Sequence, residues 1–309
     1  MDIADISVIY QDHHLLIVDK PAGVVIHPTY KHTDDTLWDA LLAYTALQGR
    51  DDWQPPDLPD EPAWANAPLH VQEMLRQRRI ERLWKEDGLL PRPCLLHRLD
   101  KDTSGIVALA RTERSRRHII RQFHDHSIVK RYLAVAQKGA PIWTQPGSSL
   151  TVTRRRCDGS EVLVDPSCAL SSLGDDELVL DGPLQRDPTE RRRCIVASTG
   201  QQAITVLKVL AVERDVFLLD VRPVTGRTHQ IRAHLAASGY AIIGDPVYAL
   251  PAENGTPEAA LTRQFLHAHS LQLSRYPDHA LCTFVAPLPD ELTMWLENYF
   301  PQILLAIPH

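Results

Sequence analysis

The chain has 309 residues, 44% of them hydrophobic and 23% charged, with a formal net charge of −6 at pH 7. This length allows a large core in one elaborated domain or two closely packed lobes, and the acidic balance argues against a protein that binds polyanions over its whole surface. The five cysteines lack Cys-x-x-Cys spacing, which speaks against a disulfide framework or a zinc ribbon, and neither a secretory signal nor an apolar run of the ~20 residues that span a membrane is present.

The segments before residue 91 predict mixed α and β structure. Residues 6–10 and 15–19 suggest an opening hairpin, and residues 35–47 carry apolar side chains at helical spacing. Residues 51–62 are rich in Pro and Asp and are expected to form a loop. From Val71 to Trp84 apolar residues recur at roughly helical intervals, which predicts a long amphipathic helix.

A charged loop follows at residues 97–105, His-Arg-Leu-Asp-Lys-Asp-Thr-Ser-Gly. Most charged nonapeptides of this kind are surface loops in which Asp, Thr and Ser form caps and turns. This one lies between apolar residues 91–96 and the continuous apolar run 106–110, which fits a buried strand. Because both of its ends are fastened to the core, the loop can hold a carboxylate in one place for chemistry.

The segment 91–132 is basic although the chain as a whole is acidic. It contains ten Arg and Lys residues and four Asp and Glu residues, a local excess of six positive charges. A positive field is therefore concentrated around the charged loop, although part of it belongs to the solvated face of a helix expected at residues 113–126.

Later segments continue the alternation of strands and helices. Strands are expected at residues 132–136, 203–212 and 216–221, and a helix at 230–237 that Gly239 stops. Just before this helix, Gly226 permits a tight turn in residues 225–232, Thr-Gly-Arg-Thr-His-Gln-Ile-Arg, which crowd polar side chains into a few positions. Together with loop 97–105, this segment predicts an active site that handles a polyanion.

These blocks resemble the RluA-type RNA pseudouridine synthases. The loop 97–105 is similar to the family's His-Arg-Leu-Asp loop ending in Thr-Ser-Gly, and Asp100 stands where the family places its nucleophilic aspartate. Residues 200–205 resemble its Gly-Lys-x-Ala-x-Thr element, with Gln201 in place of the lysine. Further similar blocks occur in family order at residues 10–28, 130–139, 225–248, 266–268 and 286–289.

The resemblance implies an α+β pseudouridine synthase fold: a two-lobed, mixed and largely antiparallel sheet flanked by helices, with the active-site cleft between the lobes. It implies one catalytic domain over residues 1–309 that modifies structured RNA, ribosomal or transfer, without a cofactor or metal. Residues 47–90 look like an insertion, and residues 143–182 match poorly. Family-like sequence begins at about Val8, so no separate N-terminal RNA-binding domain is expected.

Three residues are expected to be catalytic. Asp100 would attack the anomeric carbon, assist loss of the 2′-proton or add to the pyrimidine, and these routes remain open. Arg232 is carried over from the family as the cation that keeps this carboxylate charged. Tyr132 can stack on the uracil while its hydroxyl takes a proton from the product; outside the family context, a half-buried strand tyrosine is the simpler interpretation.

Five more residues are expected to bind RNA. In the resemblance Arg98 fills the space left by the extruded nucleotide, although such an arginine is more often half of a surface ion pair. Lys20, before Pro-Ala-Gly, would either contact a phosphate or border a turn. The others are His97, Arg227 and His229. The second carboxylate of the loop, Asp102, gives a pair like the two acids of glycoside hydrolases, but we assign it a structural role because the family match points to Asp100.

Two other classes of protein are weighed against this interpretation. A metal-dependent hydrolase would use His97, Asp100, His229 and His234, whose spacing is no recognised metal motif. A catalytically inactive RNA-binding module would have no need of the carboxylate. We expect a cytoplasmic enzyme, with a monomer as the simplest assembly.

Overall fold

The structure is a computed structural model that describes residues 6–28, 35–48, 53–56, 59–139, 150–165, 170, 173–249, 256–257 and 260–307. Its strands are β1 Ser7–Gln11, β2 Leu15–Lys20, β3 Leu89–Leu95, β4 Ser104–Thr112, β5 Val129–Lys138, β6 Thr151–Arg155, β7 Glu161–Leu163, β8 Glu177–Asp181, β9 Leu184–Arg186, β10 Cys194–Val196, β11 Ile204–Glu213, β12 Val216–Pro223, β13 Tyr240–Ile242, β14 Leu266–Ser274 and β15 Leu281–Val285. Its helices are α1 Leu37–Leu47, η2 Pro62–Trp64 (a 3₁₀ turn), α2 Leu69–Asp87, α3 Glu113–His124, α4 Gln230–Ala237, α5 Asp290–Tyr299 and α6 Pro301–Leu304.

One sheet of 13 strands organises the described part of the chain, in the order β1-β2-β4-β14-β5-β12-β11-β8-β6-β7. Strand β3 pairs with β4, β13 with β5 and β15 with β14, while β9 and β10 form a separate hairpin. Among these pairings only β4 with β14 is parallel. The expected α+β fold with a mixed, largely antiparallel sheet is therefore confirmed.

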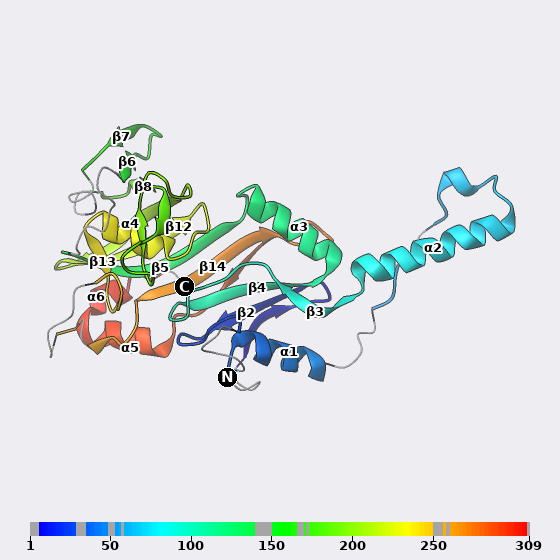
Figure 1. Cartoon of the computed structure of the whole chain (residues 1–309), viewed down its shortest axis with the longest axis horizontal. Coiled ribbons are helices and arrows are strands. Elements are labelled where there is room, and N and C mark those ends of the chain that lie inside the picture. Colours follow the sequence, from blue (N-terminus) through cyan, green and yellow to red (C-terminus); the bar gives the residue numbers. More distant parts are fainter. Residues whose placement is uncertain are drawn as a thin grey trace.

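The sheet has two halves that meet at β14 and β5. One half carries β1 to β4 with α1 and α3, and the other carries β12, β11, β8, β6 and β7 with α4 (Figure 1). The active-site residues expected from the sequence come from loops of both halves, so this arrangement decides whether they meet.

Both faces of the first half are covered, which explains its continuous apolar runs. Leu15 and Ile17 of β2 and Ile106 of β4 share a core cluster with Ile119 of α3. The alternate residues of the same strands, such as Leu16, pack into the larger core cluster on the other face, together with residues of α1. Successive side chains of a strand point to opposite faces, so a strand buried on both faces is apolar throughout.

Local capping defines the helix boundaries. Thr36 forms a capping box with Asp39 at the start of α1, and the Thr112 hydroxyl accepts from the Ser115 amide at the start of α3. Gly239, with φ +82°, follows the end of α4, as the sequence predicts. The helices expected at residues 35–47, 113–126 and 230–237 are thus confirmed.

The helix expected between Val71 and Trp84 also forms, but α2 projects away from the sheet instead of covering it (Figure 1). Its apolar Met74, Ile80 and Trp84 remain more than 40% exposed, because the contacts of α2 with the described residues lie mainly at its base, with α3, and along the segment that precedes it. In the loop expected at residues 51–62, residues 53–56 and 59–61 have no helix or strand; residues 51–52 and 57–58 lie outside the described residues.

Strands β6, β7 and β8 fall within residues 143–182, where the sequence predicted no elements, and residues 143–149 lie outside the described residues. Among the helices that the structure describes, none combines the length and apolar character that crossing a membrane requires.

Candidate active site

Lys20 holds loop 97–105 through a hydrogen bond to the backbone of Lys101. This side chain is fully buried at the end of β2, and its ammonium donates to the carbonyl oxygens of Pro21 (2.8 Å), Val24 (3.0 Å) and Lys101 (2.9 Å). Burial lowers the pKa of Lys20 to about 7. All three donors of the ammonium are used by backbone groups, so Lys20 holds the loop rather than contacting a phosphate. The expectation that Lys20 binds RNA gives way to its structural alternative.

The other end of the loop is fixed by β14. Gly105 has φ +111°, and a Cβ at this position would lie 2.3 Å from the Ala268 carbonyl oxygen, so only glycine permits this parallel pairing. Arg263 is buried and donates to the Asp102 carbonyl and to the Ser104 hydroxyl, each at 3.2 Å. The loop is therefore held by residues more than 150 positions further along the chain.

The second loop, residues 225–232, is closed by the buried amide side chain of Gln230. Its Oε1 accepts from the Thr225 hydroxyl (2.7 Å) and from the Arg227 amide (3.0 Å). Its Nε2 donates to the Ile204 carbonyl (2.9 Å) and to the Thr205 hydroxyl (3.0 Å) at the start of β11. The amide oxygen thus closes the turn before α4, while the amide nitrogen ties that turn to the sheet.

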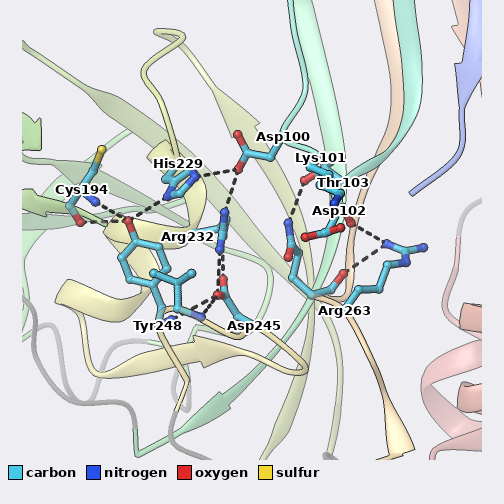
Figure 2. Close-up of polar contacts among 12 residues, drawn as sticks. Asp100, Lys101, Asp102, Thr103, Cys194, His229, Arg232, Asp245, Tyr248 and Arg263 are labelled. Carbon is cyan, nitrogen blue, oxygen red and sulfur yellow. Dashed lines mark hydrogen bonds and ion pairs between the residues drawn. The ribbon is translucent and has the colours of Figure 1, made fainter. Parts of the chain in front are cut away.

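Arg232 joins the two loops. Its Nη1 donates to Asp100 Oδ2 at 3.0 Å, while its Nε and Nη2 grip both oxygens of Asp245 at 2.7 and 2.9 Å (Figure 2). The Asp245 side chain is fully buried and also accepts from the Val247 and Tyr248 amides. The guanidinium is thereby aimed at Asp100, whose side chain is 23% exposed.

His229 approaches the same carboxylate from another side. It has a left-handed backbone, with φ +54°, and its Nε2 lies 3.8 Å from Asp100 Oδ2. Its Nδ1 lies 3.3 Å from the Tyr248 hydroxyl, which also accepts from the Cys194 amide and donates to the Cys194 carbonyl (Figure 2). Burial lowers the pKa of His229, and the Asp100 charge acts in the opposite direction.

These groups border a pocket of about 420 Å³, within the range of small-ligand sites. Asp100 is the one carboxylate among the residues described around it, and Asp102 is not part of its lining. The lining residues are Leu96, His97, Arg98, Leu99, Asp100, Thr103, Phe123, His126, Lys130, Tyr132, Pro223, Val224, Thr225, Gly226, Arg227, Thr228, His229, Gln230, Ile231, Arg232 and Leu266.

Two further ionisable side chains line the pocket: His97, which is neutral, and Lys130, which is less basic than an exposed lysine. The His97 Nε2 accepts from the Ala108 amide at 3.1 Å, and burial, aided by Lys130, lowers the pKa of His97 to about 3. The ring is therefore neutral, with its proton on Nδ1. Burial lowers the pKa of Lys130 to about 8, and its Nζ donates to the Thr225 carbonyl at 3.3 Å.

Tyr132 lies on β5 and is buried. Burial and the nearby Asp100 charge raise the pKa of its phenol, which therefore stays protonated at neutral pH. No hydrogen bond to its hydroxyl occurs among the described residues. The ring thus offers an apolar face and a free hydroxyl to a molecule in the pocket.

Comparison with known proteins identifies the fold and the chemistry. The RNA pseudouridylate synthase family matches residues 14–237. The chain belongs to this family. It is accordingly an RNA pseudouridine synthase of the RluA type, an isomerase, as the sequence motifs predicted.

The curated relatives cover nearly the whole chain. The ribosomal large subunit pseudouridine synthase D of Nitrosomonas europaea is 29% identical over 307 residues, which are 98% of this chain and 67% of that protein. The protein of the same name from Pseudomonas aeruginosa is 27% identical over 306 residues, 96% of this chain and 72% of that protein. The solved human RNA Pseudouridylate Synthase Domain Containing 4 has a TM-score of 0.55 at 20% identity, over 94% of this chain and 92% of that chain, and supports the fold.

Seven of the eight residues predicted for the synthase site line this one pocket, and Lys20 is the exception. The seven come from both halves of the sheet: His97, Arg98, Asp100, Tyr132, Arg227, His229 and Arg232. Their placement agrees with the sequence prediction, whereas the role of each stays a proposal.

Several supporting residues were missed. Asp245 and Tyr248 belong to the block 225–248, yet no role followed for them, because Asp in a Gly-Asp pair most often forms a turn. Hairpin β9–β10 was missed as well, and its Cys194 backbone holds Tyr248. The signal that was available for Asp245 was its position in a family block that also contains Arg232.

The metal-hydrolase alternative finds no support in the geometry. Both ring nitrogens of His234 are used inside the core, at 2.9 Å from the Thr205 hydroxyl and 2.9 Å from the Gly182 carbonyl. Across the described residues, no three His, Cys, Asp or Glu side chains gather as metal ligands would.

Proposed function

We propose that this enzyme isomerises uridine in ribosomal RNA to pseudouridine, with Asp100 as nucleophile acting on a nucleotide flipped into the pocket. The observation that carries the proposal is the buried Arg232 that joins Asp245 to Asp100 at the pocket wall. Ribosomal RNA is favoured over transfer RNA because curated relatives over nearly the full chain are named ribosomal large subunit pseudouridine synthases.

The chemistry needs a group that traps the sugar or the base while the glycosidic bond is broken and the base turns. A carboxylate can do this without a cofactor. Arg232 is 5% exposed and places a fixed positive charge 3.0 Å from Asp100, so an ion pair holds the carboxylate at the pocket wall. The three routes open to Asp100, at the anomeric carbon, the 2′-proton or the pyrimidine ring, all require this anion.

Tyr132 supports the proposal in a modified form. Its phenol is neutral, so it can take the C5 proton of the rejoined base only as its own proton leaves. The base itself accounts for that proton, because N1 gains one hydrogen when C5 loses one, and Asp100 is left as the free carboxylate that the next turnover requires. The ring face would stack on the uracil during the rotation.

Flipping is supported by the position of Arg98. This residue is exposed, lines the pocket and has no ion pair or hydrogen bond among the described residues. A guanidinium held at the rim of a pocket can enter the base stack in place of the extruded nucleotide.

The proposal is tested by substituting each carboxylate of the loop in turn. Asp100→Asn is expected to abolish pseudouridine formation in rRNA while leaving RNA affinity within a few-fold of wild type. Asp102→Asn is the matched control, two residues away but outside the pocket, and should retain most activity. The RNA comes from cells that lack this enzyme, and carbon-linked uridines are mapped before and after incubation.

The same experiment separates the alternatives. Conversion only in transfer RNA would make transfer RNA the substrate in place of rRNA and leave the proposed chemistry unchanged. Near-normal turnover by Asp100→Asn would exclude Asp100 as the nucleophile. RNA binding without conversion of any uridine by the wild-type enzyme would favour the inactive module. Tyr132→Phe should bind RNA normally and turn over slowly; wild-type turnover would exclude a proton-transfer role for its hydroxyl.

A further inference from the structure

A projection formed by residues 59–87, here called the α2 arm, has no part in the site described above. Helix α2 and the preceding turn η2 extend from the end of the first half of the sheet, away from the remaining elements (Figure 1). At 1.5 Å per residue, the 19 residues of α2 give the arm a length of about 28 Å. Such a projection extends the reach of the enzyme well past the pocket.

The base of the arm is firmly attached. Arg114, in the first turn of α3, forms ion pairs with Glu86 (2.6 Å) and Asp87 (3.1 Å) at the end of α2. Asp87 is buried and also accepts from the Tyr276 hydroxyl at 3.0 Å. A buried carboxylate held by two partners fixes the direction in which the helix leaves the sheet.

One side of the arm is covered by its own preceding segment. Arg76 forms an ion pair with Asp60, and Arg79 lies over the Trp64 ring at 5.0 Å and donates to the Pro59 carbonyl at 2.9 Å. These contacts brace the outer part of α2. They also show which side of the helix faces the preceding segment and which side faces solvent.

The solvent side carries a basic stripe, defined as Arg78, Arg82 and Lys85. Successive residues turn by about 100° around a helix, so positions spaced by four and three lie on one face, turned away from Arg76. All three are exposed, and none has a hydrogen bond or ion pair among the described residues. Glu81 borders the stripe on one side.

Helix α3 connects the arm to the pocket. Its first turn holds the arm through Arg114, and Phe123 in its last turn lines the pocket. Nine residues separate these positions, about 14 Å along the helix axis. Exposed Arg121, also without a partner among the described residues, lies between them, and Arg98 stands at the pocket rim.

We infer that the α2 arm is a second RNA-binding element, whose basic stripe contacts phosphates of the helical RNA that flanks the uridine in the pocket. This inference rests on the proposed function and adds to it the part of the substrate that lies outside the active site. Unpaired Arg and Lys side chains on an exposed helix match the charge of a phosphate backbone. The exposed apolar residues Leu69, Ile80 and Trp84 share the opposite face of α2, and only Met74 borders the stripe, so the stripe itself presents charge rather than an apolar patch.

The test compares two substrates. One is a long rRNA fragment that contains the mapped uridine with its flanking helices, and the other is the minimal hairpin around that uridine. The arm variant is Arg78→Gln, Arg82→Gln and Lys85→Gln combined. The matched control removes three exposed positive charges from the other half of the sheet: Lys138→Gln, Arg156→Gln and Arg214→Gln.

The arm variant is expected to raise KM for the long fragment by about tenfold or more, with kcat unchanged. The slope of log affinity against log salt should decrease by about two to three, since each lost phosphate contact removes about 0.7–0.9. On the hairpin, KM should rise far less than on the long fragment. The control variant should match wild type on both substrates.

Three outcomes would overturn the inference. Equal losses on the two substrates would indicate damage to the pocket, and an unchanged salt slope on the long fragment would show that the stripe does not contact RNA. Wild-type behaviour on naked rRNA with poor modification of ribosomal particles would assign the arm to a protein. In each case hairpin turnover by the wild-type enzyme leaves the proposed function standing, whereas failure of wild type on every RNA would remove the proposed function itself.

Discussion

The active site and the α2 arm use the same pair of side chains, arginine and aspartate, in opposite environments. Both pairs are bidentate, so they differ in exposure alone. In the site, Arg232 and Asp245 are 5% and 0% exposed. In the arm, Arg76 and Asp60 are 46% and 33% exposed. A buried pair fixes geometry because breaking it leaves a charge without solvent, whereas an exposed pair exchanges freely with water. The comparison predicts very different sensitivities to substitution.

The largest effect is expected for Arg232→Met. It removes the cation beside Asp100 and leaves Asp245 buried without its partner, at a cost of about 3–5 kcal/mol in stability. Activity should fall about 10²–10³-fold or more, as when a preorganised charge is removed from an active site. Urea unfolding and single-turnover pseudouridine formation measure the two effects.

A second substitution separates stability from catalysis in that experiment. Arg232→Met combined with Asp245→Asn should recover part of the lost stability, because no unpaired charge remains in the core. Activity should stay low, since Asp100 still lacks its cation. Recovery of activity together with stability would mean that Arg232 matters only for folding.

The next largest effect is expected on stability in acid. It comes from His234, which is fully buried on α4, beside the half of the sheet that carries β11 and β12. Burial lowers its pKa to about 4 from the ordinary value of 6.5. Between pH 6.5 and about pH 4, His234 is protonated in the unfolded chain but neutral in the folded chain, which favours unfolding. The contribution of neutral His234 to the free energy of unfolding is therefore complete above pH 6.5 and is lost as the pH falls toward 4. The loss is roughly 3 kcal/mol.

His234→Gln removes this titration. The free energy of unfolding of the variant, measured in urea, should be lower than that of wild type at pH 7.5, and the difference should shrink as the pH falls toward 4. A difference that stays constant across this range would show that His234 is protonated equally in both states.

A smaller effect is expected for Tyr248→Phe. The hydroxyl serves both Cys194 backbone groups and His229, so its loss leaves buried polar groups unpaired, at a cost of about 1–3 kcal/mol. Because His229 then loses one of its positioning contacts, kcat should fall about tenfold. An unchanged kcat in a destabilised variant would show that His229 is positioned without Tyr248.

The smallest effect is expected at the exposed pair of the arm. Arg76→Gln should leave pseudouridine formation and the melting temperature close to those of wild type, because water replaces the lost partner of Asp60. Circular dichroism melting and turnover on the long rRNA fragment test this. A large loss in either would place Arg76 in the same class as Arg232.

The sequence predicted most elements of the central sheet and much of the pocket. Apolar runs located β2, β4, β5, β11 and β12, helical spacing located α1, the charged stretch 113–126 indicated α3, and Gly239 marked the end of α4. The pairing of Asp100 with Arg232 came from the family resemblance, because no local pattern connects residues 132 positions apart. Asp245 was missed for a different reason: it is only 13 residues from Arg232, but an Asp that follows Gly most often forms a turn.

Two other differences have physical causes. The acceptors of Lys20 are backbone carbonyls, one of them at Lys101, and backbone geometry leaves no trace in side-chain composition. The spacing of apolar residues predicted helix α2. Periodicity does not say what covers the apolar side of a helix, so it could not predict that the arm projects from the sheet. Strands β6 to β8 are short and polar at several positions, and their pattern resembles that of a loop.

Strand β14 has a consequence for how the enzyme is made. It lies between β4 and β5, which follow each other in the sequence, and it comes from residues 266–274. A nascent chain that has emerged only as far as β5 carries Asp100 and Tyr132 but lacks the strand that sets their spacing. Since domains form as their residues leave the ribosome, the spacing of these two residues is set only after residues 266–274 have been made, more than 130 residues after Tyr132.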